Sequence, residues 1–113
     1  MMSSLMAPGI SIVALGAGIK LNCSISENYS ALWTYTSWIK SKETNLYLGT
    51  DILASMRSRY RIDKTISEQH NLIIDSVDLA HAGRYTCYSV MQYSLINDIQ
   101  LIVLGKRKLT VLT

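Results

Sequence analysis

The stretch Asp78–Tyr88, with the sequence DLAHAGRYTCY, constrains the fold more than any other part of this chain. Its middle residues predict a tight turn that ends at Gly83, and Arg84–Tyr88 then predicts a strand. Successive side chains of a strand point to opposite faces, so Tyr85 and Cys87 lie on the same face. The chain therefore carries a tyrosine and a cysteine together on the inner face of one strand.

The other cysteine lies in Ile19–Ile25, where apolar and polar residues alternate strictly. This alternation predicts a strand with Ile19, Leu21, Cys23 and Ile25 facing inward. Neither cysteine has the spacing of a metal site, so zinc is not expected. From the residues alone, the cysteines are either two thiols or one disulfide, and both lie in the apolar runs that a buried disulfide requires.

The order Cys23, Trp38, Tyr85, Cys87 resembles the pattern of the immunoglobulin fold. The resemblance implies an all-β, immunoglobulin-like antiparallel sandwich whose two sheets are joined by a disulfide between Cys23 and Cys87. It also implies that Trp38 packs on this disulfide and that Tyr85 forms the tyrosine corner of the fold. The core that it predicts contains Trp38, Tyr85, Leu72 and Ile74.

Two tryptophans compete for the core position of this pattern. Ile39 and Lys40 follow Trp38, and this run resembles the one that follows the core tryptophan of variable domains. Trp33 lies so close to Cys23 that it would leave a very short loop before the strand. We therefore predict that Trp38 is in the core and that Trp33 belongs to the loop or its base.

The resemblance extends from about Ile10 to Leu112 and predicts a single domain over residues 1–113, with an irregular lead over residues 1–9. Elements corresponding to strands C′ and C″ precede the predicted strand D, which favours the variable type, or V-set, over the shorter constant type. The expected strands after Ile25 begin at Trp38, Leu46, Asp51, Arg59, Asn71, Gly83 and Asp98.

The end of the chain, residues 105–113, resembles the joining segment that completes strand G in antigen receptors. The match is partial, because Leu104 stands where the segment has phenylalanine and Arg107 where it has its second glycine. A hairpin centred near Leu95 and Ile96 would place Gly105 beside Cys87. The alternative is a linker that follows a strand ending at Leu104.

The same family usually pairs the arginine that opens strand D with an aspartate six residues before the second cysteine. His81 occupies that position here, so Arg59 or Arg61 is expected either to pair with Asp78 or to stay in solvent. His70 and His81 lie in polar connections, where a solvated histidine is the expected state.

The sequence does not predict an enzyme or a cofactor site. The serines lack the G-x-S-x-G context of a nucleophile, and Gly16-Ala17-Gly18 precedes a strand where a phosphate-binding loop would precede a helix. The net charge of +3 comes without a nucleic-acid-binding motif, so no nucleic acid is expected.

We expect protein partners at two surfaces. Alternation places apolar side chains on the outer face of the G-F-C-C′ sheet, where variable domains pair as homodimers or V–V pairs. The predicted partner face consists of Ile39, Leu46, Leu48, Tyr88, Val90 and Leu104. The predicted ligand loops contain Tyr29, Trp33, Tyr35, Met91, Tyr93 and Leu95.

These surfaces lead to two hypotheses. The first is an antigen-receptor-like immune domain that pairs through the sheet face and binds ligand with its loops. The second is an adhesion or signalling domain whose sheet face binds the partner directly.

A disulfide implies an extracellular or cell-surface location. Asn28 and, less favourably, Asn22 match the N-glycosylation rule, which fits that location. The apolar run Ile10–Ile19 is too short to span a membrane, so any membrane attachment is expected from parts outside these 113 residues.

Overall fold

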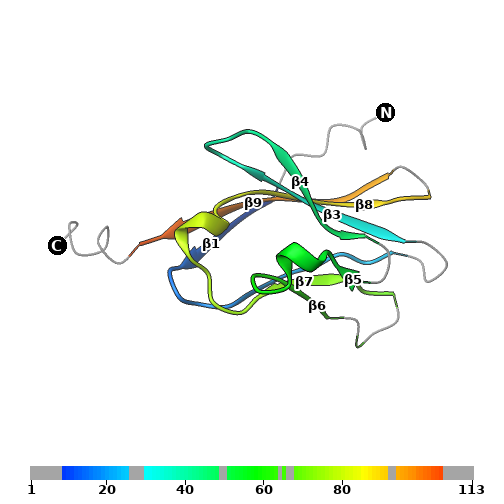
Figure 1. Ribbon diagram of the computed structural model, residues 1–113, viewed down its shortest axis with the longest axis horizontal. Helices are drawn as coiled ribbons and strands as arrows, with labels where there is room; N and C mark the ends of the chain where they lie inside the picture. The colour runs from blue at the N-terminus through cyan, green and yellow to red at the C-terminus, as the bar shows by residue number, and fades with distance from the viewer. Residues whose placement is uncertain are drawn as a thin grey trace.

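The computed structural model describes residues 9–25, 30–48, 51–63, 65, 68–91 and 94–105. The chain forms two layers of strands, with β9, β8, β3 and β4 in the upper layer of Figure 1 and β7 and β6 in the lower layer. The elements in chain order are β1 (Gly9–Ala14), β2 (Ile19–Leu21), β3 (Ala31–Ser37), β4 (Glu43–Leu48), β5 (Asp51–Ile52), η2 (Ala54–Met56), β6 (Arg61–Asp63), β7 (Asn71–Ile74), η3 (Leu79–His81), β8 (Gly83–Ser89) and β9 (Ser94–Leu104).

Within the described residues the larger sheet has the strand order β1-β9-β8-β3-β4-β5, and the smaller sheet has the order β2-β7-β6. The strands pair antiparallel except β1, which runs parallel to β9. Strands such as β9 are rich in isoleucine, leucine and valine, which pack well on a pleated surface. The architecture is therefore the two-sheet β-sandwich that the sequence predicts.

The Cys23–Cys87 disulfide joins the two sheets, as predicted. Cys23 follows β2 of the smaller sheet and Cys87 lies on β8 of the larger one, with 6.4 Å between their Cα atoms. Leu21, Leu72 and Ile74 line the same interior and are fully or almost fully buried. The core thus lies between the inner faces of the two sheets.

The prediction that Trp38 is the core tryptophan is wrong. Trp33 is fully buried, whereas Trp38 is 49% exposed in the turn after β3. The register of β3 against β8 sets Trp33 opposite Cys87, and the Trp33 indole N–H donates to the backbone carbonyl of His70 at 2.7 Å. The connection from Ile25 to β3 is short, so the strand begins earlier than expected.

Tyr35 was predicted to lie in a ligand loop, and this too is wrong. It lies on β3 opposite Tyr85, with its ring centroid 4.9 Å from that of Tyr85. Its hydroxyl donates to the carbonyl oxygens of Ala80 and Ala82 at 2.9 and 2.7 Å. Tyr35 therefore fixes η3 against the sheet.

Leu46 was predicted to face outward, but it is buried in the core. A β-bulge interrupts the pairing of β3 with β4 between Trp33 and Thr34. Because a bulge adds one unpaired residue to a strand, the neighbours Leu46 and Tyr47 both turn inward.

Tyr85 forms the corner that joins η3 to β8. Its hydroxyl donates to the His81 carbonyl oxygen at 2.7 Å and lies 3.0 Å from the Tyr60 hydroxyl. Gly83 begins β8 with φ of +156°, and a Cβ atom there would meet the Thr36 carbonyl oxygen at 2.5 Å. Only glycine fits this position without a shift of the backbone.

The expectation of two solvated histidines is wrong, because His70 and His81 are both buried. His81 closes the start of η3 as a capping box: its Nδ1 accepts from the Asp78 backbone N–H at 2.9 Å, and the Asp78 carboxylate accepts from the Ala80 N–H at 2.8 Å. Arg59 pairs with Asp78 at 3.4 Å, which is one of the pairings that the sequence left open.

The hairpin of β8 and β9 is tighter than predicted. Ser89 pairs with Ser94, and Cys87 pairs with Asn97, so the expected position of Gly105 beside Cys87 is wrong. Leu95 lies on β9 and not in a loop. The joining-like residues 106–113 lie outside the described residues, as do Asn28, Tyr29 and Tyr93.

Candidate protein-interaction surface

The face of the larger sheet that points away from the smaller sheet carries a line of apolar side chains, here called the apolar row. Leu48 pairs with Leu32, Leu32 pairs with Tyr88, and Tyr88 pairs with Leu95. Paired residues of neighbouring strands share a face, so the row crosses β4, β3, β8 and β9. Leu48 is 51% exposed and the other three are half-buried.

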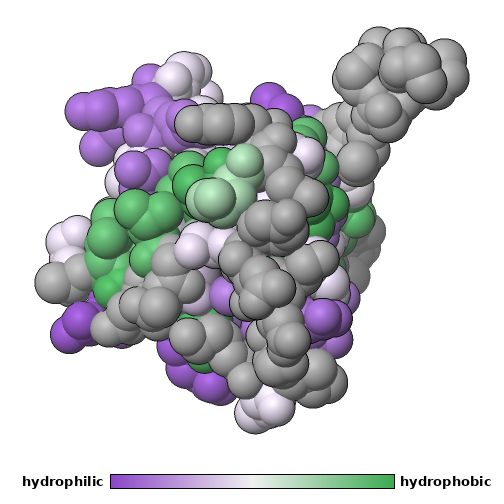
Figure 2. Space-filling model, turned by 90° about the vertical axis from the view of Figure 1, so that its right-hand side faces the viewer, coloured by the Kyte–Doolittle hydropathy of each residue, from purple (hydrophilic) through white to green (hydrophobic). Residues whose placement is uncertain are grey.

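The apolar row lies toward the end of the sandwich that carries the β8–β9 turn. Figure 2 views that end and shows hydrophobic surface in patches at mid-height, below a hydrophilic area at the upper left. Met91 lies in the turn itself and is exposed. A partner that docks on this half of the face would therefore meet apolar surface first.

Beside the apolar row lies a polar network that the sequence did not predict. Asp98 is 2% exposed and accepts two hydrogen bonds from the Arg84 guanidinium, from Nε at 2.8 Å and from Nη2 at 2.6 Å. The hydrogen bond to Asp98 raises the pKa of Arg84. Two charges are thus paired in the middle of the outer face, where the sequence predicts apolar side chains.

Two threonines extend this network toward β4. The Thr34 hydroxyl is hydrogen-bonded to the Thr86 hydroxyl and donates to the Glu43 carboxylate at 3.1 Å. Both threonines are buried although they lie on the outer face. The hydrogen bonds of this network run between strands of the same sheet. The buried polar groups of Asp98, Thr34 and Thr86 therefore all have hydrogen-bond partners.

A second apolar area lies at the β1 edge of the same face. Ile10 and Ile12 of β1 are exposed, and Ile12 pairs with Ile102 of β9, which is also exposed. Leu104 follows on the same face at the end of β9 and is half-buried. Leu104 was predicted for the partner face, whereas Ile10, Ile12 and Ile102 were not, because only the parallel pairing of β1 with β9 brings them together.

The structure brings together some of the predicted partner-face residues and separates others. Leu48 and Tyr88 meet in the apolar row, whereas Leu46 is inside the core. Ile39 is 93% exposed but lies in the turn after β3, away from the row. Val90 is half-buried just after β8, where its N–H donates to the Ser30 carbonyl oxygen at 2.9 Å.

The described part of the chain contains no cluster of three or more histidine, cysteine, aspartate or glutamate side chains that could hold a metal ion. Its helices are single turns of the 3-10 type, and none is long and apolar enough to cross a membrane.

Asn22, the second possible glycosylation site, is exposed, and its backbone carbonyl oxygen accepts a hydrogen bond from the Asn97 side chain at 2.7 Å.

Comparison with known proteins identifies the fold. No protein-family model and no curated protein matches the chain. The crystal structure of the ZIG-8 IG1 homodimer is similar with a TM-score of 0.68 and 18% identity over 88% of this chain and 81% of that one. The crystal structure of the ZIG-8–RIG-5 IG1–IG1 heterodimer, in its monoclinic form, is similar with a TM-score of 0.65 and 17% identity over 87% and 83% of the two chains. The chain is an immunoglobulin-like β-sandwich.

Proposed function

We propose that this domain is a non-catalytic, variable-type recognition module that pairs with a second immunoglobulin domain through the outer face of its larger sheet. The variable type is supported by β4 and β5, which extend the larger sheet beyond β3, and by the parallel pairing of β1 with β9. The two similar crystal structures are, by name, a homodimer and a heterodimer of IG1 domains, which favours the same mode of assembly.

The observation that carries this proposal is the apolar row. Its four side chains cross four neighbouring strands without a charge among them. Protein interfaces typically have a buried, more apolar centre and a polar, solvent-accessible rim. The Arg84–Asp98 pair and the two threonines supply polar groups of that kind directly beside the row.

The partner to which we commit is a second copy of this chain. In a two-fold symmetric dimer, the same surface contacts itself, so a suitable face must not carry a large excess of one charge. Arg84 and Asp98 neutralise each other on this face, and the Glu43 carboxylate bonded to Thr34 adds one further negative charge, so neither copy presents a large excess of one charge there. When two copies pair through this face, the apolar row of one copy is buried against the apolar row of the other.

The antigen-receptor-like hypothesis has less support among the described residues. Trp33 and Tyr35, which it assigned to a ligand loop, are directed into the core. Its joining-like segment begins at Gly105, where only the first residue is described. We therefore favour recognition by the sheet face over recognition by the loops.

The compartment remains part of the proposal. A disulfide between Cys23 and Cys87 persists in oxidising surroundings, which favours an extracellular or cell-surface location. Asn28 is the proposed glycosylation site of that location.

Charge substitutions in the apolar row test the proposal. We expect Leu48→Arg and Tyr88→Arg to weaken self-association at least tenfold in sedimentation equilibrium, because each places like charges opposite each other in a two-fold interface. Leu79→Arg is the matched control, since Leu79 is exposed on η3 outside this face. Equal dissociation constants for all three variants and the unmodified chain would refute the assignment of the face.

A further inference from the structure

A cavity of about 580 Å³ opens beside the turn that joins β3 to β4. This turn lies at the end of the sandwich opposite the β8–β9 turn (Figure 1). The cavity lies between the turn that joins β3 to β4 on one side and η3 on the other. Its size falls within the range of small-molecule sites in proteins, which is roughly 300–1,000 Å³. The outer face and the apolar row are not part of it.

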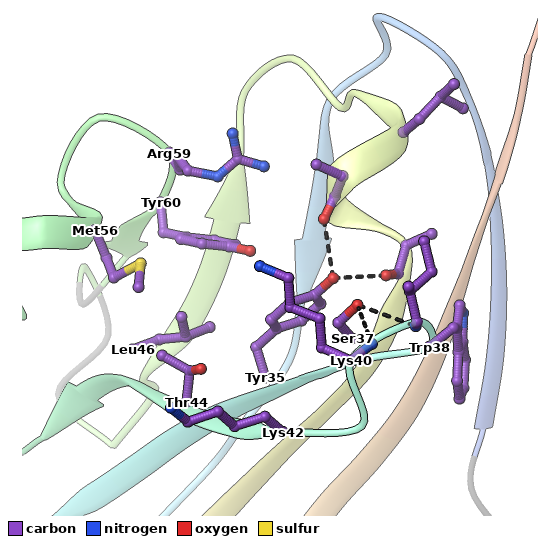
Figure 3. Close-up of a pocket in the computed structure, with 14 residues that line it drawn as sticks. Tyr35, Ser37, Trp38, Lys40, Lys42, Thr44, Leu46, Met56, Arg59 and Tyr60 are labelled. Atoms are coloured by element: carbon purple, nitrogen blue, oxygen red, sulfur yellow. Dashed lines mark hydrogen bonds between the residues drawn. The ribbon is translucent and has the colours of Figure 1, made fainter.

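Apolar and aromatic side chains form the inner wall of this cavity. Tyr35, Leu46, Met56 and Tyr60 line it, as Figure 3 shows. The Tyr35 hydroxyl is bonded to two carbonyl oxygens of the η3 segment, and the Tyr60 hydroxyl lies 3.0 Å from that of Tyr85. The polar tips of both tyrosines are thus occupied by the protein, and their rings are held in place as wall.

The mouth of the cavity carries large exposed apolar side chains. Trp38 and Ile39 in the β3–β4 turn are 49% and 93% exposed, and Leu79 on the opposite side is 62% exposed. The turn is ordered, because the Ser37 hydroxyl accepts from the backbone N–H groups of Ile39 and Lys40 at 3.1 and 3.4 Å. The apolar mouth is therefore presented by a fixed turn.

Cations surround this apolar space. Lys40, Lys42 and Arg59 line the cavity, and no aspartate or glutamate does so among the described residues. Arg59 is paired with Asp78, but neither lysine forms an ion pair with a residue that the structure describes. In Figure 3 the Lys40 side chain turns back toward the side of the cavity that Tyr60 forms.

We propose that this cavity binds a soluble single-chain amphiphile with an anionic head group, such as a fatty acid or an alkyl phosphate. The hydrocarbon chain lies against Met56, the Tyr35 ring and the exposed side chains of the mouth, and methionine adapts its shape readily to such a chain. The carboxylate or phosphate lies between Lys40 and Lys42, whose charges no carboxylate among the described residues neutralises. Because the cavity is apolar inside and has cations at its rim, it favours a ligand with both a hydrocarbon tail and an anionic head group over a ligand with only one of them.

The test uses the full chain and alkyl phosphates at concentrations below micelle formation, with titration calorimetry as the readout. We expect saturable binding of dodecyl phosphate at one site, with affinity rising up to about fourfold for each added methylene while the cavity still buries it. Inorganic phosphate and uncharged dodecyl maltoside, which each supply one half of the ligand, are expected to bind at least tenfold more weakly.

Substitutions locate the site. We expect the double variant Lys40→Gln/Lys42→Gln to lose at least tenfold in affinity for dodecyl phosphate. Lys20→Gln is the control, because Lys20 is an exposed lysine on β2 that does not line the cavity, and we expect it to leave the affinity unchanged. Bound amphiphile is also expected to shift the fluorescence of Trp38 to shorter wavelength, and the shift is expected to disappear in Trp38→Phe.

Three results would overturn the proposal. They are absence of saturable binding, equal affinity in the double lysine variant, and binding that occurs only with vesicles of anionic phospholipid and not with the free amphiphile. The last result would assign the turn and its lysines to a membrane surface. Because the outer face is untouched by these variants, failure here leaves the dimer proposal standing.

Discussion

The two tryptophans provide the sharpest test of how this core is built. We expect Trp33→Phe to destabilise the domain strongly and Trp38→Phe to leave its stability within about 0.5 kcal/mol of the unmodified chain. The chemical change is the same in both variants. Only the surroundings differ, since Trp33 is fully buried opposite Cys87 and Trp38 is half exposed in a turn.

The expected magnitude for Trp33→Phe has three parts. Replacing the indole with a phenyl ring removes roughly 50 Å² of buried apolar surface, which corresponds to about 1 kcal/mol. Loss of the indole N–H removes a donor from the buried His70 carbonyl oxygen, and such a loss typically costs about 1–2 kcal/mol. The cavity that the smaller ring leaves adds about 1 kcal/mol, so the free energy of unfolding should fall by about 3–4 kcal/mol.

Urea unfolding measures this difference. With a denaturant slope of about 1.5 kcal/mol per molar urea, the midpoint of Trp33→Phe should shift downward by about 2–3 M and that of Trp38→Phe hardly at all. A larger destabilisation by Trp38→Phe, or equal shifts for the two variants, would refute the assignment of Trp33 to the core.

Three further substitutions test the corner at η3. Tyr85→Phe should lower the free energy of unfolding by about 1–3 kcal/mol, because the buried Tyr85 hydroxyl donates to the His81 carbonyl and contacts the Tyr60 hydroxyl. A loss below about 0.5 kcal/mol, measured by urea unfolding, would contradict this. Gly83→Ala should cost about 2–3 kcal/mol, whereas Gly105→Ala, with nothing within 4 Å of the added atom, should cost almost nothing by the same assay. Burial, with the Arg59 guanidinium, lowers the pKa of His81 below its usual 6.5. The unfolded chain therefore takes up this proton at a higher pH than the folded one, so stability should fall as the pH drops below about 6.5. His81→Gln should flatten this decline in thermal unfolding at a series of pH values, and an unchanged slope would exclude His81 as its source.

Sequence patterns predict what depends on local alternation. The period-two pattern around Cys23 and the Tyr-x-Cys run that ends at Cys87 specify which side chains share a face, and the disulfide follows the resemblance that they carry. The sandwich and its central cross-link are therefore accessible from the residues. The pairing of Arg59 with Asp78 was likewise among the expected arrangements.

Features that depend on register were not predictable in the same way. The choice between Trp33 and Trp38 depends on where β3 begins, which its pairing with β8 decides. Leu46 turns inward because a bulge shifts the pairing of β3 with β4. The sequence of these two strands contains no residue that predicts the bulge. The Arg84–Asp98 pair joins two strands across the β8–β9 hairpin, so its detection requires the correct hairpin register.

The burial of His81 had a local signal. Asp78 followed three residues later by a hydrogen-bonding side chain is the spacing of a capping box, although glutamate or glutamine is the usual partner. A histidine ring nitrogen accepts the same backbone N–H, which draws the ring into the protein instead of leaving it in solvent.

We propose that the outer face of the larger sheet pairs with a second copy of the chain. The most direct test is the weight-average mass of the unmodified chain in solution, measured by light scattering over a concentration series that spans the micromolar range. We expect a mass that rises with concentration from that of a monomer toward twice that value. A monomer mass at every concentration would contradict it.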